Sequence, residues 1–218
     1  SSTGSVDIVI YAKKNGAYTI VADYYPPEKS EAKQIADEAL EISTGDIEKL
    51  SEFIRNRKID GVFAGISEFN LLNAMSLANR FQMPFYCTRQ QWDMVEKKDL
   101  FRRLCEEYHV PCPKVYYTGG KMKKNDWDKV QFPAVIKPVD GSASTGVFIC
   151  QDKEEMKKVE EDSLAASQCQ TIIIEEFVEG KEFTAHYTIS NGKAALSIVD
   201  NRYSVAVNPG NVTTIPIA

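Results

Sequence analysis

The sequence lacks the patterns that mark several common classes of protein. No apolar run approaches the roughly 20 residues that a membrane-spanning helix needs, and the first residues do not follow the basic and then apolar order of a signal peptide. The five cysteines are an odd number and widely spread, with no Cys-x-x-Cys pair. These absences predict a cytoplasmic protein with reduced cysteines, no disulfide framework and no zinc site.

Two common nucleotide-binding signatures are also missing. The chain contains no Gly-x-x-x-x-Gly-Lys-Ser/Thr string, which excludes the usual P-loop. The first strand-to-helix turn offers only Gly4 and no Gly-x-Gly-x-x-Gly string, which argues against a nicotinamide or flavin site. Asp23 stands at a strand end where it could hold a ribose, but a lone acidic residue there is more often part of a turn.

Charge and composition limit the partners. The 26 basic and 31 acidic residues are interspersed along the 218 residues, so that no surface for a polyanion is indicated. The Lys-Met-Lys-Lys cluster at residues 121–124 fits a solvated loop better than a nucleic-acid patch. We therefore expect no nucleic-acid partner and no membrane partner; a homo-oligomer is compatible with the sequence.

The N-terminal part alternates helices and strands. Apolar periodicity predicts helices at residues 6–15, 30–40, 47–57 and 67–81, and strands at residues 18–23, 41–43, 60–65 and 84–87. This alternation with short connections is typical of an open, doubly wound sheet. Because a helix comes first, we expect the first strand to precede Ser1. The sequence predicts an α/β fold that begins with a Rossmann-like domain over residues 1–90.

Residues 91–218 form a second region of different character. It is predicted to contain helices at 100–108 and 153–166 and strands at 115–117, 132–136, 146–150 and 171–178. A hairpin of residues 182–190 and 193–200 turns at Asn191-Gly192, the dipeptide most typical of a two-residue turn. This pattern predicts an antiparallel sheet with helices.

One stretch of the second region, residues 132–147, could carry chemistry. An apolar strand ends at Lys137, and a loop of small residues follows: Gly141, Ser142, Ala143, Ser144, Thr145 and Gly146. Such a loop lets backbone N–H groups approach an anion, and the lysine adds a cation with three donors. The alternative is an ordinary β-turn with a solvated lysine, and these residues alone leave both interpretations open.

Four features follow one another along the second region: Lys98 near the start of a helix, Lys137 with its loop of small residues, the segment of residues 175–178, and Glu182. In this order and spacing, the chain resembles ATP-grasp carboxylate–amine ligases, the group of the carbamoyl-phosphate synthase large chain and D-alanine–D-alanine ligase. Lys98 lies 13 positions before Pro111 and matches the first ATP lysine, although His109 replaces the glycine of the family. Lys137 and the loop match the second lysine and the flap over the phosphates, although Ala143 and Thr145 stand where small or glycine residues are common.

Two further matches lie near the C-terminus. Glu182 matches the glutamate that binds the ribose hydroxyls, and the segment that receives adenine is matched by Glu175, Glu176, Phe177 and Val178. The resemblance implies that backbone groups of Glu176 and Val178 hold the adenine edge. Taken singly, Lys98 would be a solvated lysine, and Glu175 and Glu182 would be surface strand residues.

The resemblance implies a Rossmann-like pre-ATP-grasp domain followed, over residues 91–218, by a partial ATP-grasp α+β domain. It also implies ATP and Mg²⁺ as cofactors, with transfer of the γ-phosphoryl group to a small carboxylate and attack by an amine. Lys137 and, more weakly, Arg202 are the catalytic candidates, while His186 better fits a surface strand residue. The acidic residue and Glu-x-Asn string that hold magnesium in the family do not follow Glu182. We therefore expect those ligands outside this chain, and this chain alone to be inactive or nearly so.

Two alternatives remain. A non-catalytic ATP-binding regulatory module would keep Lys98, Lys137 and Glu182 and would lack the metal ligands even beyond Ala218, where a ligase would have them. A Rossmann oxidoreductase would instead bind a nicotinamide. The sequence does not identify the carboxylate or the nucleophile.

Overall fold

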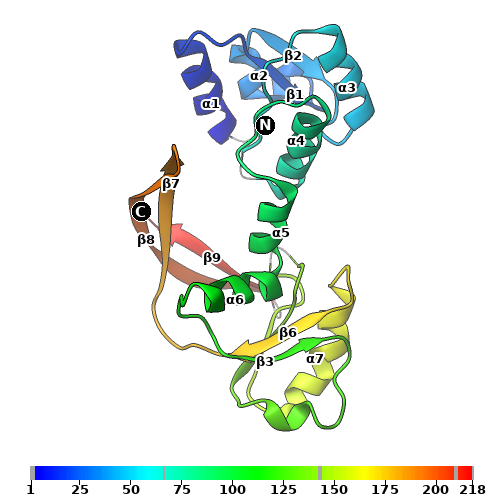
Figure 1. Ribbon diagram of the computed structural model, residues 1–218, viewed down its shortest axis with the longest axis vertical. Coiled ribbons are helices and arrows are strands. Elements are labelled where there is room, and N and C mark those ends of the chain that lie inside the picture. Colours follow the sequence, from blue (N-terminus) through cyan, green and yellow to red (C-terminus); the bar gives the residue numbers. More distant parts are fainter. Residues whose placement is uncertain (1–2, 66, 142–143, 209–210, 218) are drawn as a thin grey trace. The chain divides into compact units, whose positions relative to one another are not determined.

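The computed structural model describes residues 3–65, 67–141, 144–208 and 211–217 (Figure 1). The chain divides into two compact units, Ser1–Gln91 and Trp92–Ala218. Both units combine helices with strands, which confirms the predicted α/β fold class. No helix in the described ranges is long and apolar enough to cross a membrane.

The first unit contains a parallel sheet of two strands, β1 (Ile20–Asp23) and β2 (Glu38–Glu41). Its helices are α1 (Thr3–Lys14), the short η1 (Pro27–Lys29), α2 (Glu31–Ile35), α3 (Ile47–Asn56) and α4 (Glu68–Arg80). Helices α3 and α4 share a buried apolar cluster of Leu50, Ile54 and Leu77, against which Leu40 of β2 also packs. Burial of this cluster joins the helices to the sheet.

Two helices of the first unit begin at side-chain caps. The Asp46 carboxylate accepts a hydrogen bond from the Lys49 N–H at the start of α3 (3.1 Å), and the Ser67 hydroxyl accepts one from the Asn70 N–H at the start of α4 (3.4 Å). Each cap satisfies a backbone donor that has no partner inside the helix. The predicted helices at 47–57 and 67–81 are confirmed.

The helix predicted at residues 30–40 is wrong in its second half. Helix α2 ends at Ile35, and the N–H groups of Asp37 and Glu38 both donate to the Thr19 carbonyl oxygen at 3.1 Å. This contact starts the pairing of β2 with β1, so the strand begins at Glu38 rather than at residue 41. Pairing with a neighbouring strand here overrides a helical periodicity.

The strands predicted at residues 60–65 and 84–87 are also wrong, since these described residues form no strand. The two segments do lie together, because the Tyr86 hydroxyl donates to the Ala64 carbonyl oxygen at 2.8 Å, and the rings of Phe63 and Tyr86 are 6.0 Å apart. The apolar side chains of the two segments pack together, but a strand also needs a ladder of backbone hydrogen bonds.

Both carboxylate oxygens of Asp23, at the end of β1, have partners within the first unit. One carboxylate oxygen lies 3.0 Å from the Lys33 ammonium and accepts from the Tyr25 N–H at 2.8 Å, and the other accepts from the Ser30 hydroxyl at 3.0 Å. The Lys33 side chain is fully buried. Asp23 therefore stabilises the turn after β1, which agrees with the structural interpretation of this residue.

Asp37 gives the first unit a predicted pH dependence. Its hydrogen bonds with Lys13 and with the N–H and hydroxyl of Thr19 lower the pKa of the carboxyl from 3.8 to about 2. The ionised form therefore stabilises the folded chain above pH 4, and this contribution is lost as the pH falls from about 4 to about 2. We expect urea midpoints of wild type and Asp37→Asn to differ at pH 7 and to converge toward pH 2. A difference independent of pH would contradict this.

The second unit contains a four-stranded antiparallel sheet in the order β3-β6-β4-β5. Its strands are β3 (Val115–Gly119), β4 (Ala134–Pro138), β5 (Phe148–Cys150) and β6 (Ile172–Glu176). The helices nearby in sequence are α5 (Arg89–Glu96), which the sequence analysis does not predict, α6 (Lys98–Glu107), the short η2 (Trp127–Lys129) and α7 (Lys153–Ala165). The antiparallel geometry predicted for this region is confirmed.

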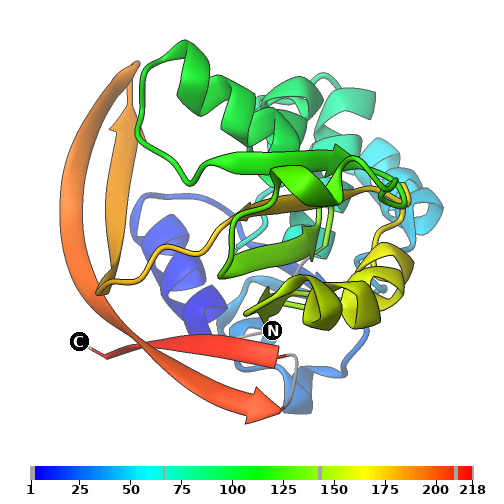
Figure 2. The same cartoon turned by 90° about the horizontal axis from the view of Figure 1, so that it is seen from below.

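Helix α7 covers one face of this sheet, over β4 and β5 (Figures 1 and 2). The core between them is apolar and includes Ile136, Ile174 and Met156, all fully buried. Burial alternates along β4, since Ala134, Ile136 and Pro138 are buried and the residues between them are partly exposed. Because side chains alternate across a strand, Lys137 lies on the sheet face away from this core.

A separate three-stranded antiparallel sheet follows, with β7 (Glu182–Ser190), β8 (Lys193–Asn208) and β9 (Asn211–Ile217). The predicted hairpin across Asn191-Gly192 is confirmed. Figure 2 shows the long, bent β8, which pairs with β7 along its first half and with β9 along its second. The continuation of β8 beyond residue 200 and the strand β9 are additions to the sequence analysis.

Candidate functional site

Helix α6 places two basic side chains on one of its faces. Lys98 and Arg102 are four residues apart, which brings their side chains to the same side of an α-helix. The Lys98 ammonium donates to the Gly141 carbonyl oxygen at 2.7 Å, and the Lys98 backbone N–H donates to the Val139 carbonyl oxygen at 2.9 Å. The start of α6 is therefore fastened to the segment that follows β4.

Glu175 of β6 lies at the centre of a buried ion cluster. Only 2% of its surface is exposed. Arg102 donates from Nε to Oε2 at 2.8 Å and from Nη2 to Oε1 at 3.1 Å, and Lys137 also donates to Oε1. The alternative of a surface strand residue is therefore excluded for Glu175.

The register of the sheet explains how these ions meet. Val135 lies opposite Glu175, and Lys137 lies opposite Ile173, so Lys137 and Glu175 are diagonal neighbours on one face. Long side chains reach across such a diagonal. The other face of the same strands carries Ile136 and belongs to the core. We call Lys98, Arg102, Lys137 and Glu175 the basic cluster.

Glu175 is ionised in this cluster. Burial alone raises the pKa of a carboxyl, but the hydrogen bonds from Arg102 and the charge of Lys137 outweigh it, and the pKa of Glu175 lies below its usual value of 4.5. The cluster therefore contains three basic groups and one carboxylate.

The surroundings of Lys98 disfavour its charged form. Burial and the positive charge of Lys137 lower its pKa, and the carboxylates of Glu96, Asp140 and Glu175 offset this only in part. The effect of the Lys137 charge on Lys98 shows that the side chains of the two lysines lie near each other. An anion bound between them would stabilise both charged forms.

Two glycines of the predicted phosphate loop, Gly141 and Gly146, lie against Pro138 at the end of β4. Gly146 has a φ of +71°, and a β-carbon there would lie 2.6 Å from the Ala166 β-carbon; at Gly141 it would lie 2.8 Å from Pro138 Cγ. Both positions therefore require glycine for the turn itself. Ser144 also has a positive φ, 57°, and Thr145 is exposed. The predicted contacts of Ser142 lie outside the described residues, as does Ala143.

Asp140 anchors the start of this loop. One of its carboxylate oxygens accepts from the Ser167 hydroxyl at 2.7 Å, and the other accepts from the Cys169 N–H at 3.0 Å. The same Ser167 oxygen accepts from the Thr171 N–H at 3.0 Å. These hydrogen bonds hold Asp140, and with it the start of the loop, against the segment before β6.

The segment predicted to receive adenine continues from the cluster. The Glu176 N–H donates to the Lys114 carbonyl oxygen at 2.9 Å, and its carboxylate accepts from the Lys114 N–H at 3.1 Å. The N–H of Glu176 is therefore occupied by a partner within the fold. Phe177 is partly buried and Val178 is 60% exposed.

Glu182 and Arg202 lie directly opposite each other on β7 and β8, and both are exposed. Side chains opposite each other on antiparallel strands are close enough to interact. The contacts found among the described residues do not join this pair to the basic cluster. On the same hairpin, His186 Nε2 lies 2.9 Å from an oxygen of Asp200.

Arg102 is the member of the cluster that the sequence analysis misses. Its signal is the four-residue spacing from Lys98 on an amphipathic helix.

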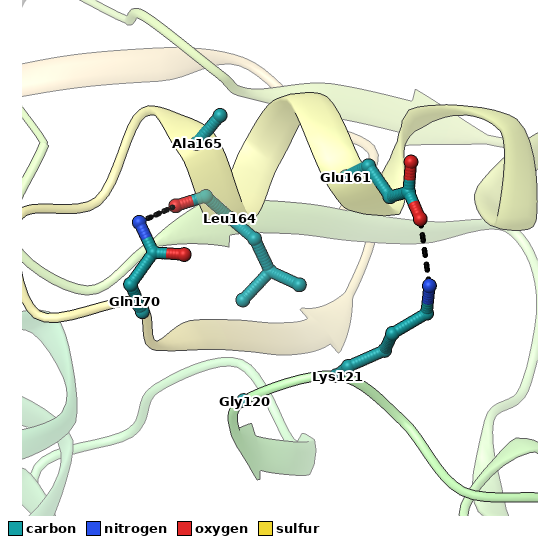
Figure 3. A pocket seen from close by; sticks show the side chains of 6 residues that line it. All are labelled: Gly120, Lys121, Glu161, Leu164, Ala165 and Gln170. Atoms are coloured by element: carbon teal, nitrogen blue, oxygen red, sulfur yellow. Dashed lines mark hydrogen bonds and ion pairs between the residues drawn. The ribbon is translucent and has the colours of Figure 1, made fainter.

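A surface pocket elsewhere in this unit contains none of the predicted site residues (Figure 3). It lies beside α7, and the ion pair of Lys121 with Glu161, 2.6 Å long, crosses it.

The described residues do not provide a magnesium site. No three His, Cys, Asp or Glu side chains gather among them in a way that could hold a metal ion. The carboxylate of Glu175 is taken up by Arg102 and Lys137. Glu175 is therefore not available as a metal ligand in this arrangement.

The arrangement defines an α/β protein whose second unit carries partly buried basic groups beside a glycine turn, which suits the binding of an anion. Residues 94–217, more than half of the chain, match the model of the ATP-grasp domain. The chain belongs to the ATP-grasp family.

Individual relatives agree with this assignment. The chain is 33% identical over 89 residues to the D-alanine–D-alanine ligase of Aquifex aeolicus (strain VF5), covering 40% of this chain and 29% of that ligase. It is 26% identical over 220 residues to the carbamoyl phosphate synthase large chain of Clostridium beijerinckii (strain ATCC 51743 / NCIMB 8052), covering 97% of this chain and 20% of that protein.

A solved structure shows the same fold. The crystal structure of biotin carboxylase from Campylobacter jejuni matches with a TM-score of 0.78 and 12% identity, covering 90% of this chain and 48% of that one. The chain thus spans less than half the length of each of these three relatives.

Proposed function

We propose that the chain binds ATP and forms the nucleotide-binding part of a carboxylate–amine ligase. The observation that carries this proposal is the basic cluster, in which Lys98 and Lys137 lie near the glycine turn after β4 with one carboxylate between three basic groups. A polyphosphate supplies the negative charge that this arrangement lacks.

The proposed roles follow the chain. Lys98 and Lys137 bind phosphate oxygens of ATP, and the loop of residues 141–146 closes over them and excludes water. Residues 175–178 receive adenine, with the Glu176 carbonyl and the Val178 backbone at its edge and Phe177 at its face. Glu182 binds the ribose hydroxyls, and Arg202 lies near the phosphate or substrate.

The proposed reaction has two steps. A carboxylate oxygen of the substrate attacks the γ-phosphorus of ATP, and the bond to the β-phosphate oxygen breaks, which gives an acyl phosphate and ADP. An amine then attacks the acyl carbon and loses a proton, and inorganic phosphate leaves. Lys137 stabilises the charge that develops on the phosphate oxygens during the first step.

Calorimetric titration of the chain with ATP, ADP, AMP and adenosine tests the binding proposal. We expect affinity to rise with each phosphate, and ATP to bind at least about tenfold more tightly than AMP, because each lysine adds a charge-assisted hydrogen bond. Equal affinities for ATP and adenosine, or no binding of ATP, would overturn the proposal.

A non-catalytic module that binds ATP is the second candidate, because the basic cluster alone fits such a module equally well. The two candidates differ in chemistry. When the full-length protein that contains this chain is supplied with ATP, Mg²⁺ and a panel of small carboxylates, a ligase forms acyl phosphates, which hydroxylamine traps as hydroxamates. A module binds ATP and yields no hydroxamate with any carboxylate of the panel.

A further inference from the structure

The two oxygens of Glu175 are not shared equally between its cations. Arg102 contacts both oxygens, at 2.8 Å and 3.1 Å, whereas Lys137 contacts only Oε1, which Arg102 also occupies. Arg102 alone is therefore able to satisfy this buried carboxylate with two parallel hydrogen bonds.

This asymmetry matters when Lys137 is needed elsewhere. If Lys137 turned from Glu175 to a phosphate oxygen without another partner for the carboxylate, a buried charge would be left unpaired at a large energetic cost. With Arg102 in place, Glu175 keeps two hydrogen bonds while Lys137 moves. A lysine that is only the second cation of its carboxylate is free to bind an anion.

We propose that Arg102 is a positioning residue that holds Glu175 so that Lys137 can pass from this carboxylate to a phosphate group of the bound nucleotide. This inference rests on the proposed function and extends it to a residue that contacts no ligand itself. The basic side chain one position further along, Arg103, is exposed and serves as a matched control on the same helix.

Calorimetric titrations of Arg102→Gln with ATP and adenosine test this role. Glutamine removes the charge but keeps a donor for Glu175, and Lys137 becomes the only cation of the carboxylate. We expect ATP affinity to fall about tenfold, because Lys137 must now leave a buried ion pair, while adenosine affinity changes less than twofold. Arg103→Gln should match wild type for both ligands.

The double variant Arg102→Gln/Glu175→Gln separates positioning from simple structural support. Without the carboxylate, Lys137 no longer needs to be released, so ATP affinity should return to within about threefold of wild type. A structural role for Arg102 predicts that the second substitution leaves the loss unchanged or enlarges it. If circular dichroism shows that the single variant does not fold, the double variant alone tests the positioning role. An ATP affinity within about threefold of wild type then supports the role, and a larger loss contradicts it.

The outcomes distinguish this inference from the proposed function. Wild-type protein that fails to bind ATP removes the proposed function. Wild-type protein that binds ATP, together with an Arg102→Gln variant that binds it equally well, or that loses adenosine and ATP affinity alike, overturns the role of Arg102 alone.

Discussion

Replacing Lys137 with methionine is expected to weaken ATP binding by about 10- to 100-fold, because a hydrogen bond to a charged group contributes about 1.5–3 kcal/mol. Methionine keeps the length of the side chain and removes its charge. In the folded chain this substitution leaves Glu175 with both hydrogen bonds from Arg102, so the carboxylate stays paired. The loss should therefore appear in ligand affinity rather than in folding.

The measurement is a calorimetric titration of wild type and Lys137→Met with ATP, ADP and adenosine. Lys158→Met is the control, because Lys158 is an exposed lysine on α7 in the same unit. The loss should be largest for ATP, smaller for ADP and absent for adenosine. An ATP affinity equal to that of the control would remove Lys137 from the phosphate site.

Local patterns predicted much of the fold correctly. Apolar periodicity marked helices α3 and α4, and Asn191-Gly192 marked the turn of the β7–β8 hairpin. These signals are local, because helical periodicity and a tight turn depend on residues that are close in the sequence. The antiparallel geometry of the second region was inferred from the hairpin that turns at Asn191-Gly192.

The errors came from interactions between distant segments. Residues 36–40 have a helical periodicity, but the N–H groups of Asp37 and Glu38 donate to the Thr19 carbonyl oxygen and strand β2 begins at Glu38. Residues 60–65 and 84–87 have the composition of strands, but a strand is defined by backbone partners, which composition does not reveal. Propensity is a weak guide wherever such pairing decides.

The candidate site was predictable to different degrees. Lys98 and Lys137 could be proposed from spacing and resemblance, and the structure brings them into one neighbourhood. The side-chain partners of Glu175 could not be read from the sequence, because Arg102 lies 73 positions away and only the folded sheet directs the carboxylate toward it. Long-range ion pairs depend on register and burial, which a single sequence does not determine.

Glu175 should also matter for stability, and its replacement by leucine tests this. Removing one partner of a buried ion cluster costs about 3–5 kcal/mol, since the opposite charges are left uncompensated. Here Arg102 and Lys137, whose side chains are 16% and 17% exposed, would face each other without a carboxylate. We expect Glu175→Leu to lower the free energy of unfolding by about this amount at pH 7.

Urea unfolding followed by circular dichroism measures the effect, with exposed Glu179→Leu as the control. The pKa of Glu175 is depressed below 4.5, so its contribution is complete above that pH and is lost as the pH falls through the lower value of the folded chain. The curves of wild type and Glu175→Leu should therefore approach each other in acid. Equal stabilities at pH 7 would contradict the prediction.

The triple variant Arg102→Met/Lys137→Met/Glu175→Leu completes the test. Replacing a whole buried ion cluster by apolar side chains of similar size is often neutral or stabilising, because no charge then has to be desolvated. We expect this variant to regain most of the stability that Glu175→Leu loses, while it binds ATP no better than Lys137→Met. Recovered stability would show that Glu175→Leu destabilises the chain through its uncompensated charges. Binding that stays weak would show that the charged cluster serves the nucleotide site.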